Sequence, residues 1–391
     1  MRALLSITAL GVFASVANAQ DAAGPQVRVT GIVCFGSRTN AVVEIQPTRG
    51  ALLRPILRAG EKIDGVEVVS IDPSQGLVVV KSGELNSAFR IEGTPTGVAS
   101  PTFNLRGADS RQVLEVYQEL SGRTVLSSGN LPVTAVDLQT AAVLPPPAAA
   151  QALETILAEK GITLKTVGEK VACAVRIGDE AAIEALPPFP APVEPHLSEV
   201  LPPGMLKFQE ADILQALEIY QELAGRSVVR APVLRGKITV RSQTPLRRAE
   251  AVWLMVAAAQ LTGTRIVPEG GKFALAIPVE KTPPVVRSNP SLVRPENEQT
   301  LPPGMIRFSG AEPAAVLSVY AELCHRKAGS SDGIPPAKLS ISTQTTLTTT
   351  EALHGLDLVA ALNGLEFVPV DEDKISVRPR LAGADTAPVP K

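Results

Sequence analysis

Few side chains in this sequence have the type and spacing that enzymatic chemistry requires. The chain has three histidines and three cysteines among 391 residues. His354 precedes Asp357 by three positions in a stretch with helical periodicity, where a carboxylate could orient a general base. No nucleophile recurs beside this pair, so we interpret it as an ordinary pair on a helix surface. His196 lies in a proline-rich stretch and His325 at a predicted helix end.

The cysteines predict neither a disulfide framework nor a metal site. Cys34, Cys173 and Cys324 fall in three different segments of the predicted organisation, which excludes a disulfide within one domain. In "KVACAVRI", Cys173 alternates with valines, as expected of a buried strand residue. No Cys/His cluster has metal-ligand spacing, and P-loop, G-x-S-x-G and H-E-x-x-H motifs are missing. We therefore expect no metal, no cofactor and no enzymatic activity.

Composition narrows the classes of partner. The net charge is −2, so the chain lacks the basic footprint of a nucleic-acid-binding protein. A resemblance of the βααβ order to RNA-binding KH domains is not supported, because neither their GXXG loop nor a basic groove is present. Aromatic residues make up only 3% of the chain, which predicts aliphatic cores. We expect no nucleic-acid partner.

The N-terminus has the pattern of an export signal. "MRALLSITALGVFASVANAQ" combines a basic residue, a short apolar run and the small-x-small sequence at 17–19. The run is shorter than the roughly 20 residues of a membrane span. We predict a cleaved signal peptide at 1–19 and a periplasmic location. The alternative is a retained N-terminal anchor, and otherwise we expect membrane contact only through a partner.

One sequence segment occurs three times in similar form. "ADSRQVLEVYQELSGRTVL" at 108–126 returns as "ADILQALEIYQELAGRSVV" at 211–229 and as "AEPAAVLSVYAELCHRKAG" at 311–329. The three align on Tyr117, Tyr220 and Tyr320. We predict three repeats, here called copy one (102–178), copy two (205–278) and copy three (305–379).

Copy two shows the expected elements most clearly. Strand-like "MLKF" leads to a helix with Asp212 as N-cap and Gly225 after its end. "SVVRAP" and "GKITVRSQ" are typical of strands, and "PLRRAEAVWLMVAAAQLTG" predicts a second helix with Pro245 near its first turn. "TRIVP" and "KFALAIP" close a hairpin. The order is β-α-β-β-α-β-β, with two helices covering one face of a small sheet. One helix face is expected to carry Ile213, Leu217, Tyr220 and Ala224.

The remaining segments complete an α+β organisation. Residues 27–92 consist of short β-rich runs and predict a small all-β module. The proline-rich stretches 179–204 and 279–304 are typical of extended spacers, and 380–391 of a disordered tail. The last hairpins turn on "GEK", "GGK" and "EDK", which suggests that their lysines are equivalent. Those lysines are Lys170, Lys272 and Lys374.

The repeat resembles the N-terminal periplasmic domains of secretins, the outer-membrane channels of type II secretion and type IV pilus systems. Copies one and three match more loosely than copy two. A secretin continues into a β-rich pore region. Because the sequence ends at Lys391 after copy three, we expect no channel. The matching residues of copy two are Phe208, Ala211, Asp212, Ile213, Leu217, Gly236, Lys237, Ile238, Thr239, Val240, Glu250, Ala251 and Gly263.

The first module, 27–92, is similar to the homology region of GspC, the inner-membrane coupling protein of type II secretion. That family module docks on the first periplasmic domain of a secretin. The GspC N-terminus is anchored, whereas this one has a cleavable pattern. The matching pieces are Gly31, the strand 41–45, Gly60, 66–71 and 78–80.

These resemblances imply a non-enzymatic periplasmic adaptor or scaffold that binds a secretin, other secretion components or copies of itself. We expect strand edges to bind the partner through backbone hydrogen bonds. The alternative is a periplasmic sensor related to the short N-terminal domains of TonB-dependent signalling receptors; an envelope structural protein is a third possibility. The residues predicted to bind a partner are Val29, Thr30, Ile32, Val33, Lys237, Ile238, Thr239 and Val240.

Overall fold

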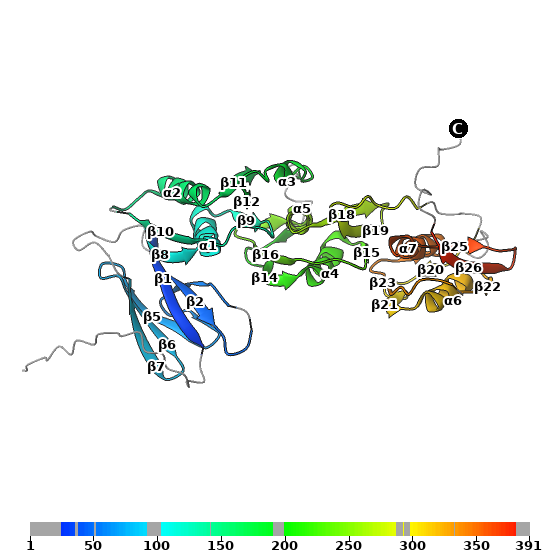
Figure 1. Ribbon diagram of the computed structural model, residues 1–391, viewed down its shortest axis with the longest axis horizontal. Helices are drawn as coiled ribbons and strands as arrows, with labels where there is room; N and C mark the ends of the chain where they lie inside the picture. The colour runs from blue at the N-terminus through cyan, green and yellow to red at the C-terminus, as the bar shows by residue number, and fades with distance from the viewer. Residues whose placement is uncertain are drawn as a thin grey trace, which may run out of the picture. The chain divides into compact units, whose positions relative to one another are not determined.

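The chain forms two compact units (Figure 1). The computed structural model describes residues 25–35, 38–50, 52–91, 103–140, 142–190, 199–286, 292, 298–331 and 333–380. The first unit ends at Ala108 and also includes Ala135–Leu144, and the second consists of Asp109–Thr134 and the chain from Pro145 onward. The predicted signal peptide at 1–19 and the predicted tail after Arg380 lie outside the described residues.

The first unit is built from two β-sheets that share one core. One sheet has the order β10-β8-β1-β2-β3 and the other β4-β5-β6-β7. Alternate residues of β5 and β6, such as Val68 and its partner Val80, are buried in that core together with Ile32 and Val43 of the first sheet. The strands are β1 (Gln26–Phe35), β2 (Arg38–Gln46), β3 (Ile56–Arg58), β4 (Lys62–Ile63), β5 (Val66–Asp72), β6 (Leu77–Ser82), β7 (Leu85–Arg90), β8 (Phe103–Asp109) and β10 (Ala135–Gln139).

Strand β1 lies in the middle of its sheet. It pairs with β2 along its length and with β8 over Gly31–Val33. A Cβ at Gly31 would lie 2.4 Å from Leu105 Cδ2, so glycine permits the close approach of β1 to β8. Since β8 and β10 lie within the range predicted for copy one, strands from the predicted β module and from copy one pair in one sheet. The predicted division into domains stays a prediction.

The second unit contains the helices and the remaining strands of the repeats. Copy one contributes α1 (Ser110–Ser121), β9 (Thr124–Ser127), α2 (Pro146–Glu159), β11 (Ile162–Val167) and β12 (Val171–Arg176), followed by α3 (Ala181–Glu184). Copy two, with its lead-in, contributes β13 (Val200–Leu201), β14 (Lys207–Asp212), α4 (Ile213–Ala224), β15 (Ser227–Arg230), β16 (Lys237–Arg241), β17 (Leu246–Arg247), α5 (Arg248–Leu261), β18 (Thr264–Glu269) and β19 (Phe273–Pro278). Copy three contributes β20 (Thr300–Leu301), β21 (Arg307–Ala311), α6 (Pro313–Leu323), β22 (Lys327–Ala328), β23 (Leu339–Ser342), β24 (Leu347–Thr348), α7 (Thr349–Leu362), β25 (Leu365–Pro369) and β26 (Lys374–Pro379).

The element order of copy two follows the prediction, with two additional short strands. β13 and β17 pair with each other, β14 pairs with β16, and β15, β19 and β18 form a three-stranded sheet. The expectation of one small sheet is therefore wrong, because the strands of copy two form three separate small sheets. Pro245 precedes β17 and not the first turn of α5, whose N-cap is Arg247. The mixed content confirms the α+β class.

The helix ends behave as their residues predict. Asp212 caps α4 and accepts a hydrogen bond from the Leu214 amide at 2.8 Å. Gly225 follows α4 with φ of 61°, in the left-handed region. At the corresponding place after α6, His325 adopts φ of 53° even though it has a side chain.

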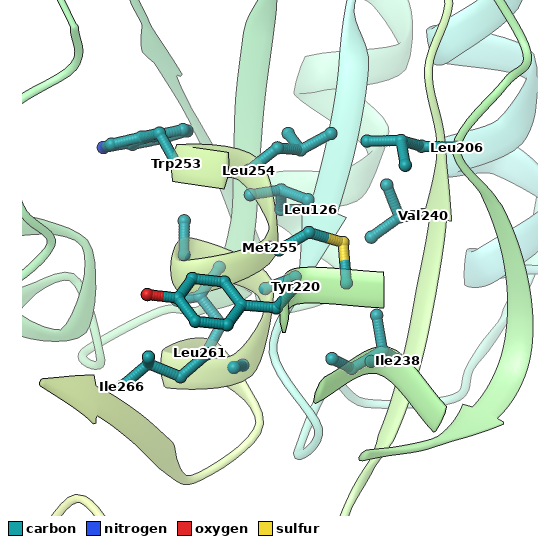
Figure 2. Packing of buried hydrophobic residues seen from close by; sticks show 14 of the residues in the cluster. Leu126, Leu206, Tyr220, Ile238, Val240, Trp253, Leu254, Met255, Leu261 and Ile266 are labelled. Atoms are coloured by element: carbon teal, nitrogen blue, oxygen red, sulfur yellow. The ribbon is translucent and has the colours of Figure 1, made fainter. Parts of the chain in front are cut away.

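Neighbouring copies share their cores. Leu126 of β9 in copy one lies among Leu254, Met255 and Val240 of copy two (Figure 2). The second large core in the same way combines Leu275 of β19 with residues of copy three. The copies are therefore stacked side by side through continuous hydrophobic contacts, and a copy does not bury its core alone.

Some residues of the proline-rich stretches pack on the copies. After copy one, α3 is followed by Phe189, whose ring packs edge-on against Trp253 with centroids 4.9 Å apart. The Trp253 indole donates to the Pro187 carbonyl at 2.9 Å. In the second stretch, Leu292 is buried in the core of copy three. The expectation of an extended spacer is wrong for Ala181–Glu184, which form α3, and for the rest of both stretches it stays a prediction.

Candidate interaction surfaces

The surfaces between copies repeat the same apolar design. In copy one, Cys173 lies with Val171 and Val175 in the core of copy two, while in copy two Phe273, Leu275 and Ile277 lie in the core of copy three. The intervening alanines of β19 belong to copy two's own core. β12 and β19 are thus buried on both faces, which explains their continuous apolar runs "VACAV" and "FALAI".

Helix α7 is shaped to receive β19. A Cβ at Gly355, in the middle of α7, would lie 2.7 Å from two carbons of the Phe273 ring. The equivalent position of α5, nine residues before the glycine that follows the helix, is Leu254. Phe273 of copy two is larger than its counterpart Val171 of copy one. Its ring fits in the space left by the absence of a side chain at Gly355, because close packing tolerates neither a void nor an overlap.

Polar groups at the rim fix each joint in the same register. Lys170 Nζ donates to the Pro245 carbonyl at 3.0 Å, and Lys272 Nζ donates to the equivalent Thr346 carbonyl at 3.1 Å. The hydroxyls of Thr124 and Ser227 accept hydrogen bonds from the backbone amides of Gln243 and Gln344, at 3.2 and 2.9 Å. Both joints therefore use one set of anchors.

The joint between copies one and two adds a buried ion pair. Lys170 Nζ lies 2.9 Å from Glu250 Oε2, and the Glu250 side chain is only 4% exposed. Burial opposes the charge of Glu250, but hydrogen bonds from Arg247 and Lys170 outweigh it and lower the pKa of that carboxyl. Glu250 also completes the N-terminal capping box of α5, so the ion pair couples helix capping to the joint.

The predicted equivalence of Lys374 with Lys170 and Lys272 is wrong. The backbone amides of Thr124, Ser227 and Lys327 donate to the carbonyls of Lys170, Lys272 and Asp373, respectively. Asp373 therefore takes the place of the anchoring lysine, and Lys374 corresponds to Phe273. The hairpin of copy three has the length of the others, and the lysine comes one position later.

The far face of copy three is polar. Ile375 and Val377 of β26 turn inward to the core, whereas Lys374 and Arg378 are exposed and Ser376 is half-buried. In copies one and two the corresponding outward positions are apolar and covered by the next copy. At the start of the stack, α2 buries Ala149, Leu153 and Leu157 but exposes its other face. The outward face of β26 therefore differs in chemistry from the outward faces of β12 and β19.

The structure places the first set of predicted partner-binding residues inside a sheet. Ile32 and Val33 pair with β8 on one side and with β2 on the other. Thr30 is buried and its hydroxyl donates to the Val42 carbonyl at 3.3 Å, while Val29 pairs with Val43. The expectation of a free edge at Ile32 and Val33 is wrong, because copy one supplies the missing strand. Any other role of these residues in binding stays a prediction.

The second set lies on β16, which pairs with β14. Ile238 and Val240 are buried in the core shared with copy one, and Lys237 and Thr239 are exposed. The Thr239 hydroxyl accepts a hydrogen bond from the Glu210 amide at 3.0 Å. Only two of the four predicted side chains are therefore accessible to a partner, and their binding role stays a prediction.

The histidine and aspartate on α7 do not act as a pair. His354 Nε2 lies 3.7 Å from Glu269 Oε1 of copy two, and burial lowers the pKa of His354 more than this carboxylate raises it. Asp357 hydrogen-bonds the Tyr320 hydroxyl inside copy three, and burial raises the pKa of Asp357 to about 7. The interpretation as a surface pair is wrong, since both side chains are half-buried and have separate partners.

Other reactive groups are used in packing. Tyr117 donates to Glu154 at 2.9 Å, at the position equivalent to Tyr320 and Asp357. The thiols of Cys34, Cys173 and Cys324 are free and buried, and burial raises the pKa of Cys173 to about 12. Among the described residues, no three His, Cys, Asp or Glu side chains are grouped to hold a metal ion. None of the described helices is long and apolar enough to cross a bilayer.

Comparison with known families identifies one copy. Residues 206–274 match the family model described as the GspD-like N0 domain. Copy two is similar to a GspD-like N0 domain. The match runs from the residue before β14 into β19, so it covers both helices of this copy. It confirms the secretin N-domain resemblance for copy two, whereas the GspC resemblance of the first module stays a prediction. No curated protein and no solved structure matches the chain.

Proposed function

We propose that this protein is a non-enzymatic periplasmic scaffold of a type II secretion or type IV pilus-like apparatus, which binds a secretin or another component of the apparatus. The GspD-like N0 match of residues 206–274 is the observation that supports this most, because it relates copy two to type II secretion. The proposal extends that relation to the whole chain through the repeated pattern of the three copies.

The joints support a scaffold role in physical terms. A stack whose neighbours share cores resists bending at its joints more than a chain of domains on flexible linkers. Within the first unit, β1 adds a strand to the sheet that contains β8 and β10 of copy one. The polar outward face of β26 in copy three opposes the stacking of a further copy on that strand.

In this proposal, partner contacts involve strand edges of the copies and the exposed residues of the first module. Lys237 and Thr239 of β16 are exposed in copy two. In the first module, Leu85 of β7 is 72% exposed, unusual for a leucine and consistent with a surface that a partner covers.

In vivo photo-crosslinking tests the proposal. A photoreactive amino acid would replace Leu85 or Lys237 in the exported chain, with Arg378 on the polar end face as the exposed control. We expect positions 85 and 237 to capture a secretin or another secretion component more strongly than position 378. Capture of a membrane regulator would instead support the sensor alternative, and recovery of no secretion or pilus component from either position would overturn the proposal.

A further inference from the structure

Copy one shows how a repeat of this type accepts an additional strand. β8 has β10 on one side and β1 on the other. The antiparallel register places Gly31 opposite Leu105, Ile32 opposite Asn104 and Val33 opposite Phe103. With β1 in place, Phe103, Asn104 and Leu105 are all buried. The chain therefore contains its own example of strand addition to a repeat.

Among the described residues, the equivalent strands of copies two and three have no such neighbour. Leu105, Phe208 and Phe308 each lie twelve residues before the tyrosine of their copy. In the described part of the chain, β14 pairs only with β16, and β21 only with β23, the counterparts of β10. Accordingly, Phe208 and Phe308 are half-buried where Leu105 is fully buried. No described strand of the chain occupies, in either of these two copies, the edge that β1 occupies in copy one.

The residues around the two open edges are alike. "LPPGM" precedes both strands. Its leucine is buried in both copies, and its glycine adopts φ of 76° and 79°, so these two residues have structural roles. The methionines Met205 and Met305 are 62% and 64% exposed. No packing role explains why the same large apolar side chain is exposed at both places, and flexible methionines suit a surface that adapts to a partner.

The edges also carry charge where copy one does not. The counterparts of the buried Asn104 are Lys207 and Arg307, which are both exposed. Basic residues at a sheet edge deter indiscriminate pairing with apolar strands. They also select a strand that brings an opposite charge to the cross-strand position.

We propose that the open edges of β14 and β21 each bind an extended strand of a partner protein. By analogy with β1, the strand runs antiparallel and places a small residue opposite Phe208 or Phe308. The next residue is acidic and faces Lys207 or Arg307, and the following residue is apolar. The exposed methionine of each copy packs against this strand. The inference deepens the proposed scaffold function, on which it rests, by naming the chemistry of the segment that is held.

A peptide derived from β1 tests this inference directly. The probe covers residues 28–34 with Ile32→Glu and Cys34→Ser, carries a fluorophore, and is titrated into the full chain while its anisotropy is measured. We expect two equivalent sites per chain. A control peptide that also carries Gly31→Val should bind at least about tenfold more weakly, because its side chain would collide with the phenylalanine opposite. Equal binding of both peptides would overturn the predicted register.

A charge swap identifies the site. The double variant Lys207→Glu, Arg307→Glu should lose about tenfold in affinity for the peptide that carries Ile32→Glu and regain it for the same peptide with Ile32→Lys in its place. Both side chains are exposed, so the fold should be unaffected. An unchanged affinity in this variant would overturn the assignment. If light scattering shows wild-type dimers that the variant lacks, the occupant is a second copy and not a partner protein.

The two proposals fail separately. Peptide binding at the edges without capture of a secretion component would retain the strand site and overturn the proposed function. Capture of a secretion component by a chain that does not bind the peptide would retain the proposed function and overturn the strand site.

Discussion

Copies two and three have the same elements but opposite outward faces. β19 of copy two presents Phe273, Leu275 and Ile277 to its neighbour, and β26 of copy three presents Lys374, Ser376 and Arg378. The strands have equal lengths and equal registers. An interior copy therefore differs from a terminal copy by side-chain chemistry at alternate positions of one strand, which decides whether another copy can stack on it.

The largest test of this comparison places a charge on each face. Leu275→Asp should destabilise the chain by at least about 3 kcal/mol, because it buries a carboxylate without a partner. Ser376→Asp should change the free energy of unfolding by less than about 0.5 kcal/mol, since its face is partly exposed. Urea unfolding followed by circular dichroism measures both. Similar losses in the two variants would refute the interior and terminal assignment.

The pH dependence of copy three provides the next test. Burial raises the pKa of Asp357 to about 7, above its ordinary value of 3.8. The folded state thus binds this proton more tightly than the unfolded state, and the free energy of unfolding should fall as pH rises from about 4 to about 7. Copy two has Val256 at this position and lacks the effect.

The variant Asp357→Asn should lose roughly 1–3 kcal/mol less of its free energy of unfolding than the wild-type chain as pH rises from about 4 to about 7. Urea unfolding of the wild-type chain and the variant at pH 4, 5.5, 7 and 8 measures the difference. Parallel pH profiles would contradict the raised pKa.

The polar anchors should have a smaller effect. Lys170→Met removes the hydrogen bond to the Pro245 carbonyl and one of the two cationic partners of buried Glu250. We expect a loss of about 1–2 kcal/mol, because a buried carboxylate then lacks one donor. Lys374→Met, on the polar end face, should have almost no effect. The fluorescence of Trp253, the one tryptophan of the chain, should report the change because it lies at this joint.

The smallest effect concerns a strained residue that copy two alone carries at its β-bulge. Glu210 adopts φ of 50°, whereas copies one and three have Gly107 and Gly310 there. Its carboxylate lies 3.0 Å from Arg111 of copy one, in a pair exposed to solvent. Glu210→Gly should be more stable than Glu210→Ala by about 1 kcal/mol, because both lose the ion pair and only glycine relieves the strain. Thermal unfolding of the two variants compares them, and equal stabilities would contradict the strain.

The sequence predicts local features of the fold better than contacts between segments. Asp212 and Gly225 specify the ends of α4 through their own chemistry, and the threefold pattern indicates three similar units. The pairing of β1 with β8 joins residues about 70 positions apart, and neither strand contains a signal for the other. The free edge expected at Val33 was therefore occupied.

The stacking contacts did leave a signal in the sequence. "VACAV" and "FALAI" are apolar at every position, which is typical of strands buried on both faces, whereas "KISVR" alternates. When the three copies are aligned on Lys170, Lys272 and Lys374, this difference between their last strands is hidden, because Lys374 corresponds to Phe273 and not to Lys272. Strand pairing, which depends on the whole hairpin, was needed to correct the alignment.

The glycine at position 355 has a consequence for the history and the engineering of this chain. The Phe273 ring of copy two occupies the space that a side chain at position 355 would fill, so copy two fits against copy three. Copy one has the smaller Val171 at the place of Phe273, and stacking copy one on copy three would leave a void beside α7. The three copies are therefore not interchangeable. A gene in which the copies were shuffled, duplicated or trimmed would encode neighbours whose contacting side chains do not fit, so the sizes of these side chains specify the order of the copies.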